Sequence, residues 1–268
     1  PRSPEPAYAA LLDKRADITL RGRLDDVADA RVLTLETLTF AGTALEASAS
    51  GEIQLTPTVQ PAIQYRATLP QLSRLSKLAS SKLAGQLRIR GNLTGKNAHL
   101  RAHGEAVHTQ LKVNNANLGT VRLTHDLDIT ERLHGRINAV MDSPAFGQGK
   151  ASTRLAVSAS TLELKELVVD LLSIKAGGKL RLSRTGAPPA GNLDVNIRSL
   201  APAGKLLGLA LEGQAVGDVK LERKNRGTAQ LNLTLEQLRN ADLSLARGQL
   251  TVSITRLMTD QHLRGTLS

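Results

Sequence analysis

Residues 231–235 read LNLTL, so leucine and polar residues alternate at every position. Successive side chains of a β-strand point to opposite faces, and this period of two therefore describes a strand with one apolar and one wet face. The same alternation returns along the chain, for example as LDVNI (193–197) and LTVSI (250–254). Buried parallel strands would read as unbroken apolar runs instead. The pattern predicts an all-β chain built on an antiparallel sheet.

The apolar face of such a sheet has to be covered, and the amino-acid composition indicates which kind of fold covers it. Of 268 residues, 41% are hydrophobic, yet the chain has no Trp or Cys and only four aromatic residues: Tyr8, Phe40, Tyr65 and Phe146. Aromatic rings usually supply much of the bulk of a filled core. A two-layer sandwich stays open as an alternative. The composition favours a single long sheet, curled along its length into an apolar groove whose aliphatic lining suits flexible acyl chains.

The residues expected to line this groove are the apolar members of the alternating segments. They are Leu33, Leu35, Ile53, Leu55, Leu87, Ile89, Val121, Leu123, Leu162, Leu164, Leu180, Leu182, Val219, Leu221, Leu231, Leu233, Leu250 and Val252.

Two segments depart from the alternation and predict one or two short helices. Segment 70–83 places leucines at helical spacing after Pro70, which suits a first helical position. Segment 198–211 resembles it but contains Pro202 and Gly204, so a shorter helix is expected there. We expect the first helix to cap one end of the sheet; a membrane-surface or partner-binding role is the alternative.

Turn signals and an internal repeat organise the chain. Gly91-Asn92, Gly177-Gly178 and 186–192 are typical of turns, which predicts roughly twenty or more short strands. Shifts of 127 to 130 residues align the two halves, pairing Gly51 with Gly178, Leu72 with Leu200, Gly85 with Gly213, Gly91 with Val219, and Gly135 with Gly265. We therefore expect a linker at 1–14, followed by a continuous groove over 15–268 that consists of two related units, about 15–141 and 142–268.

The net charge is +11, from 35 Lys and Arg against 24 Asp and Glu, and the basic residues are spread along the chain. This spread indicates a solvated face, although an anionic partner is compatible with it. Proteins that bind single-stranded nucleic acid need aromatic stacking platforms, which four aromatic residues do not supply. We expect no nucleic-acid partner, while duplex binding through phosphates alone stays open. No stretch reaches the ~20 apolar residues of a membrane span.

Catalytic and metal-binding patterns are weak. His99, His103 and His108 form the one local histidine cluster, but the surrounding pattern is strand-like and Gly104 would interrupt a helix. The segment 147–150 (GQGK) has neither the preceding glycine nor the following Ser or Thr of a phosphate loop, and is interpreted as a turn. No nucleophile elbow or zinc-protease motif is present. We expect no metal site, no cofactor and no enzymatic activity.

The Leu-rich alternating strands over essentially the whole chain, together with three segments, resemble the TamB family of Gram-negative bacteria, within the wider AsmA-like group. The three segments are LEASASGEIQL (45–55), LPQL (69–72) and LAGQLRIRGNLTG (83–95). The resemblance implies a periplasmic protein anchored in the inner membrane by an N-terminal helix outside this sequence. It also implies a long antiparallel sheet curled into an apolar groove, the β-taco.

Members of this family are implicated in moving phospholipid between the inner and outer membranes. They are also implicated in outer-membrane biogenesis with a BamA-like barrel partner, TamA, as a translocation and assembly module linked to protein secretion. An aromatic-rich C-terminal segment that would engage the barrel is missing here, so the chain resembles a middle section, and contact with TamA is expected through other parts. The family has no catalytic motif.

Three functions fit these expectations. The first is a non-catalytic groove that binds phospholipid acyl chains. The second is a chaperone-like groove or sheet edge that receives strands of outer-membrane proteins by β-augmentation. The third is a purely structural β-array. An apolar groove accepts lipid or protein equally well, so the sequence leaves the choice among them open.

Overall fold

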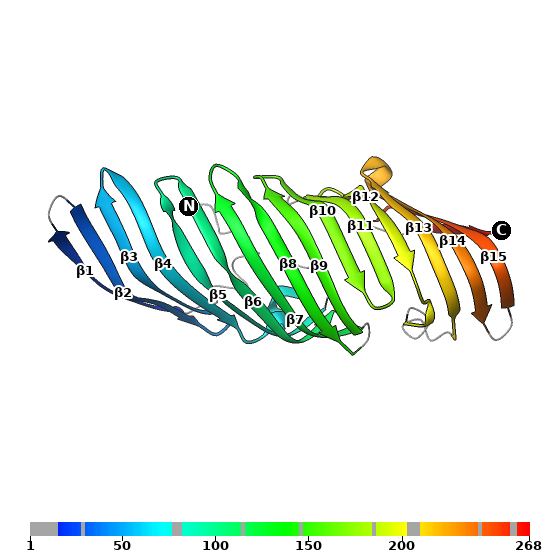
Figure 1. The fold of residues 1–268 in the computed structure, drawn as a ribbon, viewed down its shortest axis with the longest axis horizontal. Coiled ribbons are helices and arrows are strands. Elements are labelled where there is room, and N and C mark those ends of the chain that lie inside the picture. The colour runs from blue at the N-terminus through cyan, green and yellow to red at the C-terminus, as the bar shows by residue number, and fades with distance from the viewer. Residues whose placement is uncertain are drawn as a thin grey trace. The chain divides into compact units, whose positions relative to one another are not determined.

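The computed structural model describes residues 16–27, 30–76, 82–113, 116–144, 147–183, 186–202, 210–240, 243–257 and 262–268. Sixteen strands in these ranges form one antiparallel sheet that is not closed (Figure 1). Hydrogen-bonded neighbours follow the order of the chain from β1 to β16. The predicted all-β class and the single antiparallel sheet are confirmed, and the predicted linker at 1–14 lies outside the described residues.

The chain divides into two units, and each is described by itself. Unit 1 contains Pro1–Glu131 and Ala139–Pro144, and unit 2 contains Arg132–Asn138 and Ala145–Ser268. The strands up to the division are β1 (Ala16–Val27), β2 (Ala30–Gly42), β3 (Glu46–Thr56), β4 (Thr58–Leu69), β5 (Leu83–Lys96), β6 (His99–Val113) and β7 (Ala116–Ile129), and the division falls within β8 (Leu133–Ser143).

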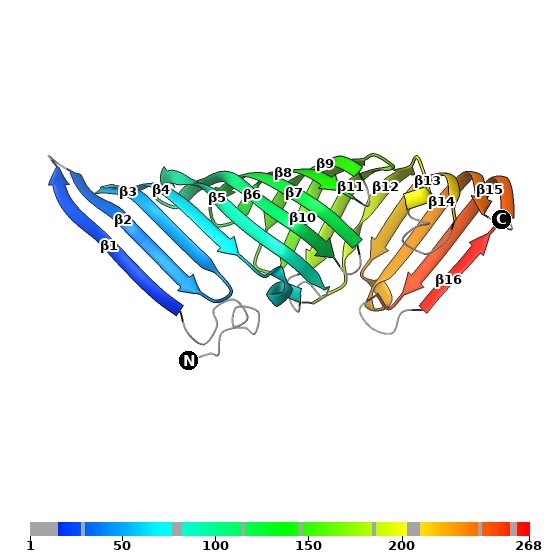
Figure 2. The ribbon, with the colours of Figure 1, turned by 90° about the horizontal axis from the view of Figure 1, so that it is seen from below.

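The remaining strands belong to unit 2, and Figure 2 shows the strands of each unit running side by side in chain order. They are β9 (Gly147–Val157), β10 (Thr161–Leu171), β11 (Ile174–Ser183), β12 (Ala190–Ile197), β13 (Glu212–Glu222), β14 (Thr228–Asn240), β15 (Leu243–Thr255) and β16 (His262–Leu267).

The strands are fewer and longer than the turn signals predicted. Gly91-Asn92 lies inside β5 and Gly177-Gly178 lies inside β11, so the prediction of turns at these two places is wrong. The physical reason is pairing on both sides: Gly91, for example, lies opposite Tyr65 on one neighbouring strand and Gly104 on the other. A ladder with two partners continues through a glycine that would favour a turn in isolation.

Several strand glycines instead serve to bend the sheet. Gly178 has φ +147°, and a Cβ on it would overlap the carbonyl oxygen of Asn192. Only glycine adopts this backbone conformation without strain. Glycine kinks and β-bulges are the devices that curve a sheet along its strands.

The same combination of a glycine and a bulge occurs in both units. Gly85 (φ +113°) faces a bulge at Gln110 (φ +53°), and Gly213 (φ +123°) faces a bulge at Gln237 (φ +52°). Gly85 and Gly213 are the pair that a shift of 128 residues aligns. Each unit therefore curves its sheet with the same local device.

The helical segments are short. Within 70–83, the described part is a 3₁₀ helix, η1 (Leu72–Leu75), followed by one helical residue, Ser76; the rest of the predicted helix lies outside the described residues. In 198–211, residues 201–202 are helical and 203–209 lie outside the described residues. A second 3₁₀ helix, η2 (Lys224–Arg226), joins β13 to β14 and was not predicted.

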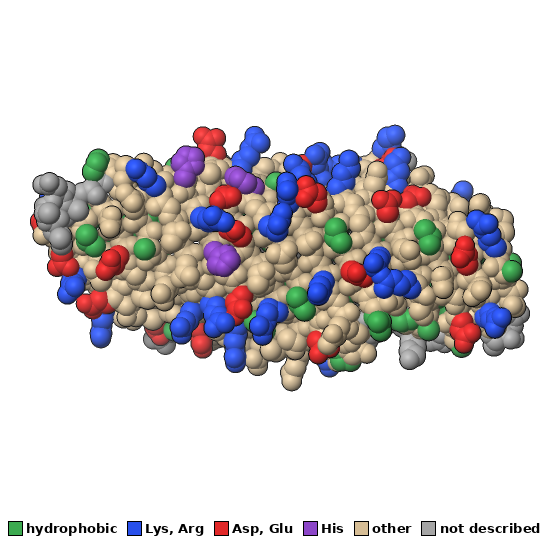
Figure 3. All heavy atoms as spheres, viewed as in Figure 1, with side chains coloured by type: hydrophobic (Ala, Val, Ile, Leu, Met, Phe, Trp, Pro, Cys, Tyr) green, Lys and Arg blue, Asp and Glu red, His purple; other side chains and the backbone are tan. Residues whose placement is uncertain are grey.

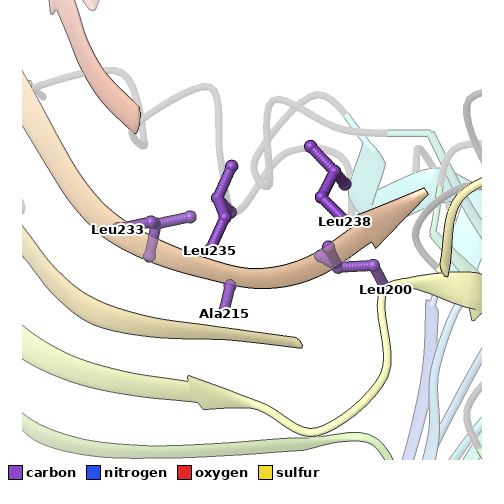
Figure 4. Close-up of a cluster of buried hydrophobic side chains, with 5 residues drawn as sticks. All are labelled: Leu200, Ala215, Leu233, Leu235 and Leu238. Atoms are coloured by element: carbon purple, nitrogen blue, oxygen red, sulfur yellow. The ribbon is translucent and has the colours of Figure 1, made fainter. Parts of the chain in front are cut away.

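Buried apolar side chains form only a small core. In unit 2, Leu200, Ala215, Leu233, Leu235 and Leu238 make a buried cluster (Figure 4). The figure shows β14 bent, with its three leucines projecting from the concave side. Among the described residues no large side chain is fully buried. In this unit the strands therefore bend over a thin apolar layer, without the filled interior that a sandwich requires.

Candidate functional site

In unit 1 the strand register gathers the apolar residues on one face, named here the apolar face. Directly opposed residues of antiparallel strands point to the same side. Leu33 on β2 lies opposite Ile53 on β3, and Ile89 on β5 lies opposite Ala106, which lies opposite Leu123 on β7. Every groove residue predicted from this unit lies on this face: Leu33, Leu35, Ile53, Leu55, Leu87, Ile89, Val121 and Leu123.

Unit 2 has its own apolar face, built in the same way. Leu193 on β12 lies opposite Val219, which lies opposite Leu231 on β14, which in turn lies opposite Val252 on β15. Every groove residue predicted from this unit lies on this face: Leu162, Leu164, Leu180, Leu182, Val219, Leu221, Leu231, Leu233, Leu250 and Val252.

The side chains of these apolar faces are partly exposed to solvent. Nearly all the predicted groove residues are partly exposed; Val121 and Leu233 are the two that are buried, and Leu55 is 40% exposed. At the outer strand of unit 1, Ile18 and Leu20 are each 68% exposed. Side chains between the layers of a sandwich interdigitate and are fully buried. The apolar faces therefore remain available to a ligand or partner.

The opposite, polar face carries the charges. In Figure 3 the visible side bears scattered Lys, Arg, Asp, Glu and His side chains, with only isolated hydrophobic ones. Cross-strand ion pairs join Arg90 to Glu105 and Arg181 to Glu163. Arg101 donates hydrogen bonds to Asp126, which lowers the pKa of this carboxyl group. Exposed pairs of this kind stabilise a fold weakly, so the polar face serves mainly for solvation.

Each unit has hollows on its polar face, among them one beside Arg90 in unit 1 and one beside Lys179 in unit 2. The first, about 400 Å³, is lined by Arg66, Arg90 and Glu105 among others. The second, about 780 Å³, includes Glu163 and Lys179. Both hollows mix positive and negative side chains, two arginines with one glutamate in the first and equal numbers of acidic and basic residues in the second, so neither presents a single sign of charge to a ligand.

The histidine cluster noted in the sequence is split between the two faces. His99 and His103 are exposed on the polar face of β6, whereas His108 is on the apolar face, opposite Leu87 and Val121. Within the described ranges, no group of three or more His, Cys, Asp or Glu side chains could hold a metal ion. The GQGK segment (147–150) is the start of β9, so its interpretation as a turn is wrong; Gly149 and Lys150 pair with Leu171 and Asp170 of β10.

Sequence reasoning missed a polar pair on the apolar face of unit 1. The Tyr65 hydroxyl lies 2.7 Å from Nε2 of His125, and the two rings stack with centroids 6.5 Å apart. Burial raises the pKa of Tyr65 and is the main cause that lowers the pKa of His125, to which the positive charge of His103 adds. The alternation could have shown His125 in phase with Leu123 and Leu127. Its contact with Tyr65 depends on the pairing of four strands.

His108 is a second polar group on this face. Its Nδ1 is buried and has no hydrogen-bond partner, and burial lowers the pKa of the ring. An imidazole held in this way is kept neutral, because desolvation disfavours its charged form.

No helix in the described part of the chain is long and apolar enough to cross a membrane. A comparison of the chain with protein-family models, with curated proteins and with solved structures finds no match.

Proposed function

We propose that the apolar faces of this chain bind the acyl chains of phospholipid, as a section of a non-catalytic conduit between inner and outer membranes. The observation that carries this proposal is the row of apolar side chains that continues across the strands of each unit and stays half-exposed. Monomeric proteins rarely leave a large apolar patch uncovered unless it has a function. The same role supports outer-membrane biogenesis.

The chemistry of the apolar faces suits acyl chains. Leu, Val, Ile and Ala supply a smooth lining, and the curved strands let a chain contact it from more than one side. Each CH₂ group that leaves water contributes ~0.8 kcal/mol, so even partial burial of two acyl chains would hold a phospholipid. The head group would stay toward solvent, because a charged group on the apolar face would lose its hydration without gaining a partner.

The resemblance to the TamB family supports the cellular setting of this proposal. On this basis the proposal assigns the chain to the periplasm of a Gram-negative bacterium. A BamA-like barrel, TamA, would be engaged by other parts of the protein.

A charge placed on the apolar face tests the proposal. Leu180, on the apolar face of β11, is half-buried. We expect Leu180→Arg to remain folded and to reduce the phospholipid that native mass spectrometry detects on the purified protein. Asn192→Arg is the matched control, because it adds the same side chain to the exposed polar face of β12. Wild-type protein without bound phospholipid, or equal loss in both variants, would contradict the proposal.

A chaperone-like role is the second candidate, and the exposed strand β1 favours it. In the part of the chain that the structure describes, β1 pairs with β2 alone, and its Ile18, Leu20 and Leu24 are well exposed. Such an edge can accept a strand of an outer-membrane protein by β-augmentation. Photocrosslinkers at Leu87 and Leu180 separate the candidates: adducts of lipid mass support the conduit, protein adducts support the chaperone, and a structural array gives neither.

A further inference from the structure

The apolar face of unit 1 contains one polar row. Tyr65 on β4, Gly91 on β5, Gly104 on β6 and His125 on β7 are directly opposed, each to the next. A Cβ on Gly91 would lie 2.5 Å from the Tyr65 hydroxyl oxygen, and a Cβ on Gly104 would lie 2.9 Å from Cε1 of His125. The two side chains therefore lie flat over the glycines and meet across two intervening strands.

The fold itself does not require polar atoms in this row. The corresponding row of unit 2, under the shifts of 127 and 128 residues, is apolar throughout: Leu193, Val219, Leu231 and Val252. Filling the space over the two glycines explains why unit 1 has rings at these positions, but it does not explain their polar atoms, because Phe would fill the space as well. Polar atoms on an apolar face cost free energy unless they find hydrogen-bond partners.

Counting donors shows what the pair offers. A neutral Tyr and a neutral His own two N–H or O–H donors between them, and the bond between Tyr65 and His125 uses one. In either tautomer one donor is left over. Among the described residues, the buried side-chain atoms that have no partner are His108 Nδ1 and Ser173 Oγ. When Tyr65 donates to Nε2, the remaining donor is the Nδ1–H of His125, which is not one of these buried atoms and is therefore open to a ligand.

The surroundings select the kind of acceptor. The flanking rows of the apolar face are Ile63, Leu93, Ala102 and Leu127 on one side, and Ala67, Ile89, Ala106 and Leu123 on the other. No cation lies in these rows to balance a phosphate, and burial keeps His125 itself neutral by lowering its pKa. An uncharged acceptor fits this place, because a charge here would be unpaired.

We propose that Tyr65 and His125 donate one hydrogen bond to an ester carbonyl oxygen of a lipid that lies on the apolar face of unit 1. This inference rests on the proposed lipid-binding function and adds selectivity to it: ester-linked lipids are preferred over lipids with the same alkyl chains and no carbonyl groups. One hydrogen bond between neutral groups makes the preference about 2- to 10-fold.

The test uses two probes in one vesicle. The protein is incubated with vesicles of equal parts dipalmitoyl phosphatidylcholine and its dihexadecyl ether analogue, and native mass spectrometry gives the ratio of the two lipids bound. We expect the wild type to favour the ester lipid and Tyr65→Phe/His125→Leu to bind both equally. His99→Gln is the control, because it changes an exposed side chain on the polar face of β6 and should leave the ratio unchanged.

Circular dichroism checks the fold of each variant. Tyr65→Leu/His125→Val, which introduces the side chains found at the corresponding positions of unit 2, is the second variant if the first does not fold. Equal binding of both lipids by the wild type, or an ester preference that survives the double substitution, would overturn the inference and leave the proposed function standing. Failure of both lipids to bind would overturn the proposed function, and the inference with it.

Discussion

Adjacent glycines of β11 have different roles. Gly178 has a backbone conformation that side-chain-bearing residues rarely adopt, whereas Gly177 does not, and a Cβ on Gly177 would meet only the Leu167 carbonyl oxygen at 3.6 Å. One glycine is needed for the path of the strand, and its neighbour is replaceable.

We expect Gly178→Ala to lower the free energy of unfolding by about 1–3 kcal/mol, because the new methyl group forces strain into the backbone. Gly177→Ala is the matched control and should change it by less than about 1 kcal/mol. Urea denaturation followed by circular dichroism measures both. Equal effects of the two substitutions would show that Gly178 does not shape the strand.

The two histidines of the apolar face make stability depend on pH. Burial lowers the pKa values of His108 and His125 in the folded protein, so the unfolded chain takes up protons first as the pH falls. Their contribution to stability is therefore present above about pH 6.5, the ordinary histidine value. It is lost as the pH falls through the lowered folded pKa.

We expect the melting temperature to decrease as the pH is lowered through this window, and the decrease to be smaller in His108→Leu. The leucine would join Leu87 and Val121 on the apolar face. His99→Gln, on the exposed polar face, should keep the wild-type profile. If the melting temperature of His108→Leu depended on pH as strongly as that of the wild type, this account would be wrong.

At the scale of the element, β11 and β14 bury their leucines to different extents. Leu180 on β11 is half-buried, whereas Leu235 on β14 is 5% exposed and belongs to the cluster around Ala215 (Figure 4). An arginine at position 180 can extend its charged end toward water, while at 235 it would be enclosed.

Leu235→Arg should therefore cost more than about 3 kcal/mol of stability, and Leu180→Arg less than about 2 kcal/mol. Thermal melts of the two variants measure the difference. A comparable loss in both would mean that the apolar face at Leu180 is closed, and the conduit geometry would be wrong.

At the scale of the whole molecule, contacts are local in the chain. The strand pairs that make extensive contacts within each unit are neighbours in sequence, and η1 contacts the strand that follows it. The free energy of unfolding of proteins built in this way is approximately a sum of the stabilities of the local units and of the interactions between neighbouring units.

A substitution that destabilises one unit should therefore leave the stability of the other unit unchanged. We expect Leu235→Ala to speed amide hydrogen exchange in β13 to β15 and to leave β3 to β5 unchanged, because the extensive contacts of β3 to β5 are with their own sequence neighbours. Hydrogen-exchange mass spectrometry resolves the two regions. Faster exchange across both units would indicate a single cooperative fold instead.

The sequence by itself determined the fold class and the face on which a residue such as Leu87 or Leu231 lies. Alternation with a period of two is a local property, and every strand segment carries it. The ends of strands were harder to predict than the fold class. Gly91 and Gly178 favour turns in isolation and become strand residues only through hydrogen-bonded partners on both sides.

Tertiary structure alone decided whether the apolar residues are enclosed or left half-open, since a sandwich and a single curled sheet share one alternating pattern. It alone also placed Tyr65 against His125. Sixty residues separate them in the chain, and they meet only because the register of four strands sets both over a pair of glycines. The register is set by the hydrogen-bonded pairing of the strands, so it cannot be read from a pattern of residues that are neighbours in sequence.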